Sequence, residues 1–171
     1  MRQRLRSRIG FLSAERREVA SQEIFAEIAL LPEFTKSRVI ALYSALPDEP
    51  QSTAFISEWY KHKRIVLPRV EGDIMQFYDY NPEQMTPGSF GINEPLGKTP
   101  CPPEQIDLMI VPGVGFTTDG KRMGRGKGFY DKYLAQSGFR ASTIGVCFKV
   151  QIVDNLPVEK FDREVDKVIA R

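Results

Sequence analysis

Glycines and cations alternate between residues 113 and 128, a composition suited to binding phosphate. Glycine occupies positions 113, 115, 120, 124, 126 and 128, and the cations between them are Lys121, Arg122, Arg125 and Lys127. Glycines let the backbone approach an anion closely, so that several N–H groups converge on it. The side-chain cations add charge-assisted hydrogen bonds. This stretch therefore predicts an anion site, against the alternative of a solvated, flexible surface turn.

The residues on either side of the loop predict the elements that position it. Leu108 to Val111 form a short apolar run, which is typical of a buried strand. Phe129 and Tyr133 fall at helical spacing, so we expect a helix to begin near Gly128. A strand, a glycine-rich loop and a helix in this order can hold phosphate at the N-terminus of the helix.

Two familiar phosphate-binding motifs do not fit this loop. The run from Gly115 to Lys121 approaches a Walker A loop, but Arg122 stands where that motif needs Ser or Thr to bind magnesium. The run from Gly124 to Gly128 lacks the glycine spacing of a dinucleotide fingerprint. A P-loop-like kinase or NTPase acting on another small substrate remains an alternative, and Arg122 counts against it.

The rest of the chain predicts strands that alternate with helices, which indicates an α/β domain. Helices are expected over 3–30 and 54–61, strands over 37–45, 64–68, 73–80, 141–148 and 165–170, and a loop over 82–103. In the first helical stretch, either Gly10 bends one helix or Ser13 caps a second. Pro68 is expected to end its strand, and residues 64–80 to supply an antiparallel excursion.

Composition places the chain among ordinary soluble globular proteins of one domain, residues 1–171. It has 171 residues, of which 42% are hydrophobic and 27% charged. The arginine-rich N-terminus lacks the apolar segment of a secretory signal, and Cys101 and Cys147 lack metal-type spacing. A cytoplasmic protein with reduced thiols is expected. A single histidine, His62, argues against a Ser-His-Asp triad or a histidine metal site.

Positive charge is concentrated in two regions, although the net charge is only +2. One region is the glycine-rich loop, and the other is residues 1–20, which hold six arginines against Glu15 and Glu18. A basic nucleic-acid-binding module is therefore a second alternative. No aromatic residue interleaves with these arginines, so nucleic acid is not the expected partner.

The order of residues in the loop resembles the signature of the 5-formyltetrahydrofolate cyclo-ligases, also called 5,10-methenyltetrahydrofolate synthetases. The matching residues are Val-Pro-Gly-Val-x-Phe from Val111, then Gly-x-Arg-Met-Gly-Arg-Gly-Lys-Gly-Phe-Tyr-Asp from Gly120. A second match is Phe-Gly-Ile-x-Glu-Pro from Phe90. The resemblance implies a single three-layer α/β domain with a mostly parallel central sheet flanked by helices.

The same resemblance implies an activity. It is the ATP- and Mg²⁺-dependent cyclisation of 5-formyltetrahydrofolate to 5,10-methenyltetrahydrofolate, which releases ADP and phosphate after phosphorylation of the formyl oxygen. The implied partners are ATP and 5-formyltetrahydrofolate, possibly polyglutamylated, with no nucleic acid and no membrane. A monomer is expected.

The resemblance also implies roles for individual residues, at the positions of this sequence that match the family. It assigns catalysis to Arg125 and Lys127, which would reach the transferred phosphoryl group. ATP binding falls to Arg2, Arg6, Arg122, Met123, Gly124, Arg125, Gly126, Lys127, Gly128, Phe129 and Tyr130. Folate binding falls to Ser44, Glu49, Phe90, Arg125, Gly126, Lys127, Gly128 and Phe129. Mg²⁺ binding falls to Asp131 and Asp162.

Four members of this set, Glu49, Phe90, Asp131 and Asp162, also have an ordinary structural interpretation. Glu49 would accept two hydrogen bonds from the amino-pyrimidinone edge of the pterin, or it is a loop carboxylate in water. Phe90 would stack on the pterin, or it anchors its loop. Asp131 would hold the metal, or it favours the helix dipole. Asp162 is otherwise a turn residue, and Phe161 before it replaces the histidine usual in the family.

Overall fold

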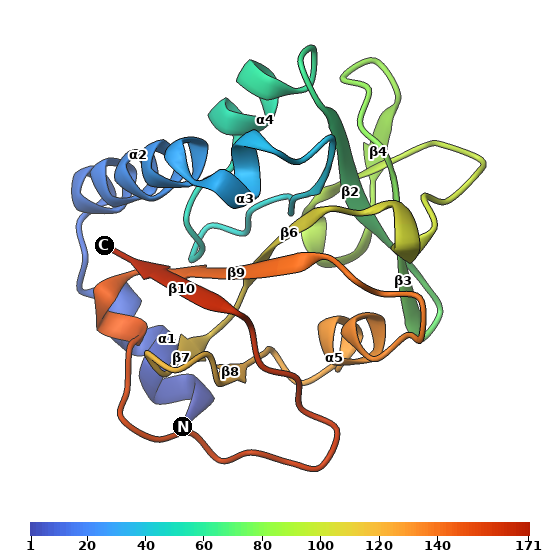
Figure 1. Cartoon of the computed structure of the whole chain (residues 1–171). Helices are drawn as coiled ribbons and strands as arrows, with labels where there is room; N and C mark the ends of the chain where they lie inside the picture. The colour runs from blue at the N-terminus through green and yellow to red at the C-terminus, as the bar shows by residue number, and fades with distance from the viewer.

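The structure is a computed structural model that describes residues Met1 to Arg171. At its centre is a six-stranded sheet in the order β10-β9-β6-β1-β2-β3 (Figure 1). The strands are β1 (Val39–Ala41), β2 (Arg64–Glu71), β3 (Ile74–Asp79), β6 (Leu108–Pro112), β9 (Ser142–Cys147) and β10 (Lys167–Ala170). All neighbours pair in parallel except β3, which is antiparallel to β2. The mostly parallel sheet and its antiparallel excursion are thus confirmed.

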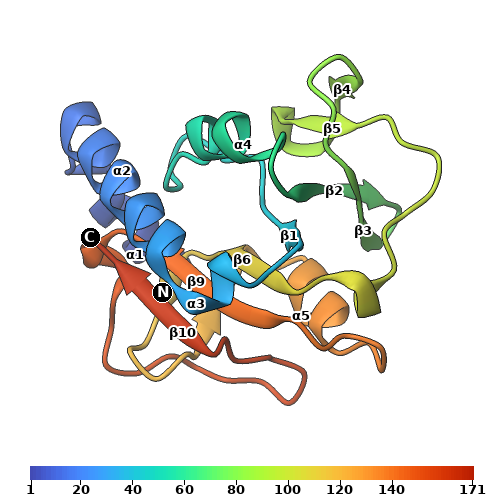
Figure 2. The ribbon, with the colours of Figure 1, turned by 45° about the horizontal axis from the view of Figure 1, so that its top comes forward.

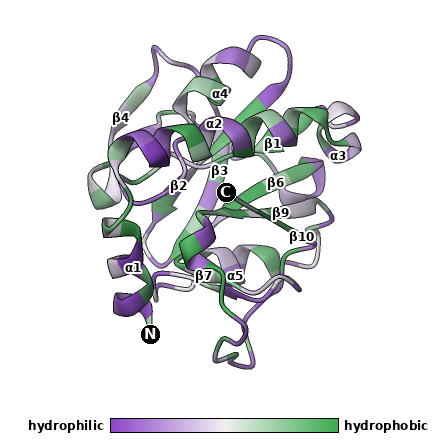
Figure 3. Ribbon diagram, turned by 90° about the vertical axis from the view of Figure 1, so that its left-hand side faces the viewer, coloured by the Kyte–Doolittle hydropathy of each residue, from purple (hydrophilic) through white to green (hydrophobic).

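Helices cover both faces of this sheet. One face packs against α2 (Ala14–Leu30), α3 (Pro32–Thr35) and α4 (Thr53–Trp59), and the other against α5 (Phe129–Leu134). Alternation along the strands explains the two layers, since Ile40 packs in the first cluster and its neighbour Ala41 in the second. Figure 3 shows hydrophobic colour along β6 and β9. All five residues of β6 are buried, as expected for a strand covered on both faces of the sheet.

The N-terminal segment forms two helices, because Ser13 caps the second one. Helix α1 (Arg2–Gly10) ends before α2 begins, and the Ser13 hydroxyl accepts a hydrogen bond from the Arg16 N–H at 3.1 Å. Leu5 and Ile9 are the buried residues of α1. Leu5 packs with Met123 of the glycine-rich loop, which brings α1 next to the loop (Figure 1).

Two local predictions were wrong. Pro68 does not end its strand, because β2 continues to Glu71. Beyond Val66 the strand pairs only with β3, so a residue without an N–H is tolerated there. Residues 82–103 are not all loop, because β4 (Met85–Pro87) and β5 (Asn93–Pro95) form a hairpin around the short helix η1 (Ser89–Gly91), as Figure 2 shows beside β2.

The remaining short elements are helices η2 (Pro103–Gln105) and η3 (Lys149–Gln151) and strands β7 (Gly115–Phe116) and β8 (Arg122–Met123). The cysteines are buried free thiols. No helix combines the length and the apolar composition that crossing a membrane requires.

The order of the strands reverses at β1. The next strand, β2, adds on one side of β1, whereas β6, β9 and β10 add on the other. In open α/β sheets the crevice at the carboxyl ends of the strands beside such a switch point is the usual ligand site. The loops that follow β1 and β6 are therefore expected to form the ligand site.

Candidate functional site

A cavity of about 320 Å³ lies at the carboxyl ends of β1 and β6. Tyr43 and Ser44 beyond β1 line it, together with Pro112 and Gly113 at the end of β6. Around it lie all the residues proposed from the sequence except Arg6: Arg2, Ser44, Glu49, Phe90, Arg122, Met123, Gly124, Arg125, Gly126, Lys127, Gly128, Phe129, Tyr130, Asp131 and Asp162. Residues more than a hundred positions apart thus share one cavity.

The glycine-rich loop carries unpaired backbone N–H groups on residues that line this cavity. Strands β7 and β8 form a small hairpin, and the chain then runs through residues 124–128 to the start of α5. None of the N–H groups of residues 124–128 donates to a backbone carbonyl. Gly126 and Gly128 have φ of +107° and +73°, values that favour glycine. Consecutive free N–H groups in such a turn can form an anion-binding nest.

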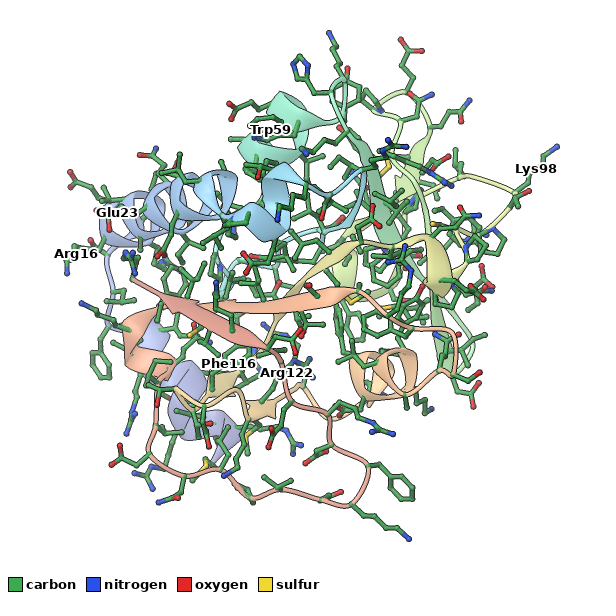
Figure 4. The ribbon with its side chains drawn as sticks, in the orientation of Figure 1. Arg16, Glu23, Trp59, Lys98, Phe116 and Arg122 are labelled. Atoms are coloured by element: carbon green, nitrogen blue, oxygen red, sulfur yellow. The ribbon has the colours of Figure 1, made fainter.

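Arg122 is held rigidly beneath the loop. Its Nε donates to the Pro112 carbonyl at 2.8 Å, and its guanidinium carbon lies 5.0 Å from the centre of the Tyr130 ring. Burial lowers the pKa of Arg122, although Asp131 opposes that effect. Figure 4 shows Arg122 in the interior near Phe116, its partner in the β7–β8 pairing, whereas Lys98 lies at the periphery. Arg122 therefore supplies a fixed positive charge to the wall of the cavity.

Arg125 and Lys127 differ in their surroundings. Arg125 forms ion pairs with Asp48 and with Glu49, at 3.2 Å for the latter. Burial opposes ionisation of Asp48, but Arg125 and Arg6 outweigh it and lower the pKa of that carboxyl. Lys127 is exposed and forms no ion pair. Lys127 is consequently the loop cation at the cavity that no acidic side chain neutralises.

The N-terminal helix contributes its arginines to the edge of the site. Arg2 lines the cavity and its Nε donates to the Gly124 carbonyl at 2.9 Å. Arg6 lies outside the cavity, in an adjacent depression of about 680 Å³ that Arg2 and Arg125 also line. Its Nε is 3.2 Å from Asp48, which bridges it to Arg125. The depression adjoins the cavity through these shared arginines.

Asp131 and Asp162 each keep one carboxylate oxygen without a hydrogen bond from the protein. Asp131 Oδ1 accepts from the Arg163 N–H at 3.0 Å, and Asp162 Oδ2 accepts from the Glu159 N–H at 2.7 Å. No third acidic, cysteine or histidine side chain joins them in a metal-ligand cluster. Two carboxylates with free oxygens fit Mg²⁺, which commonly takes one or two protein carboxylates and completes its shell with phosphate and water. Phe161, between Lys160 and Asp162, is 76% exposed.

The other side of the cavity carries the residues proposed for folate. Glu49 is buried, and its Oε2 accepts from the Leu46 N–H at 3.0 Å. Burial raises the pKa of Glu49, against the lowering by that N–H and by Arg125. Phe90 is 54% exposed at the cavity and has φ of +61°, a strained value for a non-glycine residue. Ser44 Oγ donates to the Asn93 carbonyl at 3.2 Å, which joins the loop after β1 to the β4–β5 hairpin.

Sequence reasoning missed several residues of the site. Asp48, which bridges Arg6 and Arg125, and Glu94, a buried carboxylate at the cavity, were not proposed. Glu94 belongs to the matched block that begins at Phe90, so the motif contained the signal. Met75 of β3 lines the cavity, whereas Tyr78 of the same strand does not, and the Tyr78 hydroxyl donates to Glu71.

Comparison with known proteins matches the chain along its whole length. A model of the 5-formyltetrahydrofolate cyclo-ligase family matches residues 1–171. The curated 5-formyltetrahydrofolate cyclo-ligase of Mus musculus is 29% identical, over 99% of this chain and 91% of the relative. That of Haemophilus influenzae is 31% identical, over 94% of this chain and 92% of the relative.

Solved structures show the same architecture. The NMR structure of Aquifex aeolicus 5,10-methenyltetrahydrofolate synthetase superposes with a TM-score of 0.88 at 35% identity, covering 99% of this chain and 87% of that one. The 5,10-methenyltetrahydrofolate synthetase of Mycoplasma pneumoniae gives 0.79 at 29% identity, covering 98% and 94%.

Proposed function

Because the chain belongs to the 5-formyltetrahydrofolate cyclo-ligase family, we propose that it converts 5-formyltetrahydrofolate and MgATP to 5,10-methenyltetrahydrofolate, ADP and phosphate. One observation carries this proposal beyond the family name. A single cavity joins an unpaired amide nest and the free cation of Lys127 to the exposed aromatic ring of Phe90, whose backbone has a strained, positive φ. The first two features suit a triphosphate, and the third suits a flat heterocycle.

We propose that the nucleotide lies on the side of the glycine-rich loop. The N–H groups of residues 124–128 and the guanidiniums of Arg2 and Arg122 would bind its phosphates, with Arg6 reaching them from the adjacent depression. Asp131 and Asp162 would hold Mg²⁺ through their free oxygens. The bound ion would neutralise phosphate charge, as in other phosphoryl transfers.

The proposed reaction has two steps. First, the formyl oxygen attacks the γ-phosphorus, an O–P bond forms, and the bond to ADP breaks. Arg125 and Lys127 would stabilise the charge on the transferred group and hold it against the formyl oxygen. Second, N10 attacks the formyl carbon and loses its proton, while the C–O bond breaks and phosphate leaves. Burial of the folate end between Phe90 and β2 would exclude water from the activated intermediate.

The direct test is to mix the protein with MgATP and 5-formyltetrahydrofolate and to follow the absorbance of the methenyl product. Product should form only when all three are present, with one ADP released for each ring closed. ATP hydrolysis measured with and without the folate separates this activity from that of an NTPase acting on another substrate. Folate-independent hydrolysis with no methenyl product would overturn the proposal.

The raised pKa of Glu49 predicts that the pH profile of kcat/KM for 5-formyltetrahydrofolate has an acid limb, on which kcat/KM falls as Glu49 becomes protonated. An ionised carboxylate accepts hydrogen bonds from the pterin, and protonation replaces one acceptor with a donor. Since burial raises the pKa of Glu49, kcat/KM for 5-formyltetrahydrofolate should fall with acid at a pH above about 4.3, the ordinary glutamate value. Glu49→Gln should lower the plateau and abolish this limb. Rates need correction for enzyme-free cyclisation at each pH, and an unchanged limb in Glu49→Gln would contradict the assignment.

A further inference from the structure

Glu94 is a buried carboxylate at the cavity with one unused oxygen. The residue is only 7% exposed, and it lines the cavity from β5. Its Oε2 accepts from the Val70 N–H at 2.8 Å, whereas Oε1 accepts from no donor of the protein. No lysine or arginine pairs with this carboxylate. Burying a charge without a full set of partners is costly, so the oxygen is placed for a donor that arrives with a ligand.

The neighbours of Glu94 indicate which ligand supplies that donor. The apolar side chains that line the cavity from β2, β3 and the β4–β5 hairpin, which carries Glu94, are Pro68, Val70, Met75, Phe90 and Ile92. The cations and glycines of the phosphate side come from a different loop. A carboxylate repels phosphate, so it disfavours the triphosphate at this end of the cavity. A flat ring system with N–H groups on its edge satisfies both the apolar wall and the free acceptor.

We propose that Glu94 is a folate-binding residue whose Oε1 accepts a hydrogen bond from an N–H group of the reduced pterin, in addition to the contact proposed for Glu49. This inference rests on the proposed function. Glu94 offers an oxygen with no partner in the protein, whereas both Glu49 oxygens already accept hydrogen bonds, from the Leu46 N–H and from Arg125. Glu94 fixes the orientation of the pterin, and the phosphate side fixes the nucleotide.

Gly88 explains how the carboxylate keeps its position. A methyl group built on Gly88 would collide with the Glu94 carboxyl group, so only glycine leaves room for it there. Gly88 itself has φ of −127°, which alanine adopts without strain. Gly88→Ala should therefore displace the Glu94 side chain without straining the backbone of the loop. Gly88→Ala is therefore a second way to remove the Glu94 carboxylate from its position as hydrogen-bond acceptor.

Glu94→Gln tests the role directly. A carboxylate provides acceptors for both Val70 and the ligand, whereas glutamine provides one carbonyl acceptor and an NH₂ group that cannot accept. KM for 5-formyltetrahydrofolate should rise at least about tenfold, as expected for loss of a hydrogen bond to a charged group. KM for ATP and the thermal unfolding midpoint should stay unchanged. Gly88→Ala should give the same selective rise.

The matched control is Glu83→Gln, the same change at an exposed carboxylate of the same segment outside the cavity. It should leave both KM values unaltered. Unchanged KM for the folate in Glu94→Gln and Gly88→Ala, or equal losses for folate and ATP, would overturn the inference. So would a fall in kcat with KM for the folate unchanged. If the wild-type protein formed no methenyl product, the proposed function would fail first, and the folate assignment of Glu94 with it.

Discussion

Lys127→Ala should lower kcat for methenyl product formation by at least about tenfold, as expected when a charge-assisted hydrogen bond to the transferred phosphoryl group is lost. Lys127 lines the cavity, is exposed, and has no acidic partner, so its charge is available to the ligand. Arg125 shares its charge with Asp48 and Glu49 and cannot fully replace it. Rapid mixing with saturating MgATP and folate would measure the chemical step.

Lys121→Ala is the matched control for this prediction. Lys121 lies in the same loop but outside the cavity, and it pairs with Asp119 at 3.6 Å. Its loss should leave kcat and both KM values close to wild type, since an exposed ion pair contributes little. If Lys127→Ala retained full kcat and an unchanged KM for ATP, Lys127 would have neither of the roles proposed for it.

Asp131→Asn should raise the Mg²⁺ concentration required for half-maximal activity by at least about tenfold, because a neutral amide replaces a charged oxygen ligand. The substitution keeps an oxygen that can accept from the Arg163 N–H, so the loop should stay folded. Asp162→Asn should act in the same direction, and the double variant should lose activity at any practical Mg²⁺ concentration. Initial rates over a Mg²⁺ titration at fixed free ATP measure the effect.

Asp154→Asn controls for the removal of one negative charge. Asp154 is exposed in the same C-terminal segment as Asp162 and lines neither the cavity nor the adjacent depression. Its Mg²⁺ dependence should match that of the wild-type protein. A Mg²⁺ requirement that is unchanged in both Asp131→Asn and Asp162→Asn would show that these carboxylates do not hold the metal.

The sequence predicted the elements around the glycine-rich loop well because their signals are local. The apolar run before Pro112 became β6, and the helical spacing after Gly128 became α5. The prediction that Pro68 ends its strand was wrong because a proline interrupts a strand only where its missing N–H is needed for pairing. Which neighbour β2 pairs with at Pro68 is a property of the sheet and not of the sequence near it. The β4–β5 hairpin was missed since each strand has only three residues.

The site was predicted unevenly for a similar reason. The glycine-rich loop is one continuous segment, so its members could be proposed together. Asp48 acquires its importance only when the fold brings Arg6 and Arg125 to it from opposite ends of the chain. Glu94 looks like a loop carboxylate until burial and the absence of a donor to Oε1 become visible. Such properties are tertiary, and no short sequence window contains them.

The hydrogen bond from Arg2 to the Gly124 carbonyl has a practical consequence for handling the protein. Arg2 is part of the cavity wall, so a purification tag fused close ahead of it would begin next to that wall. Arg171 lines neither hollow, so a tag fused after it would not begin at the wall of either one. Activity measured on material with an uncut leading tag would report on the tag as well as on the protein.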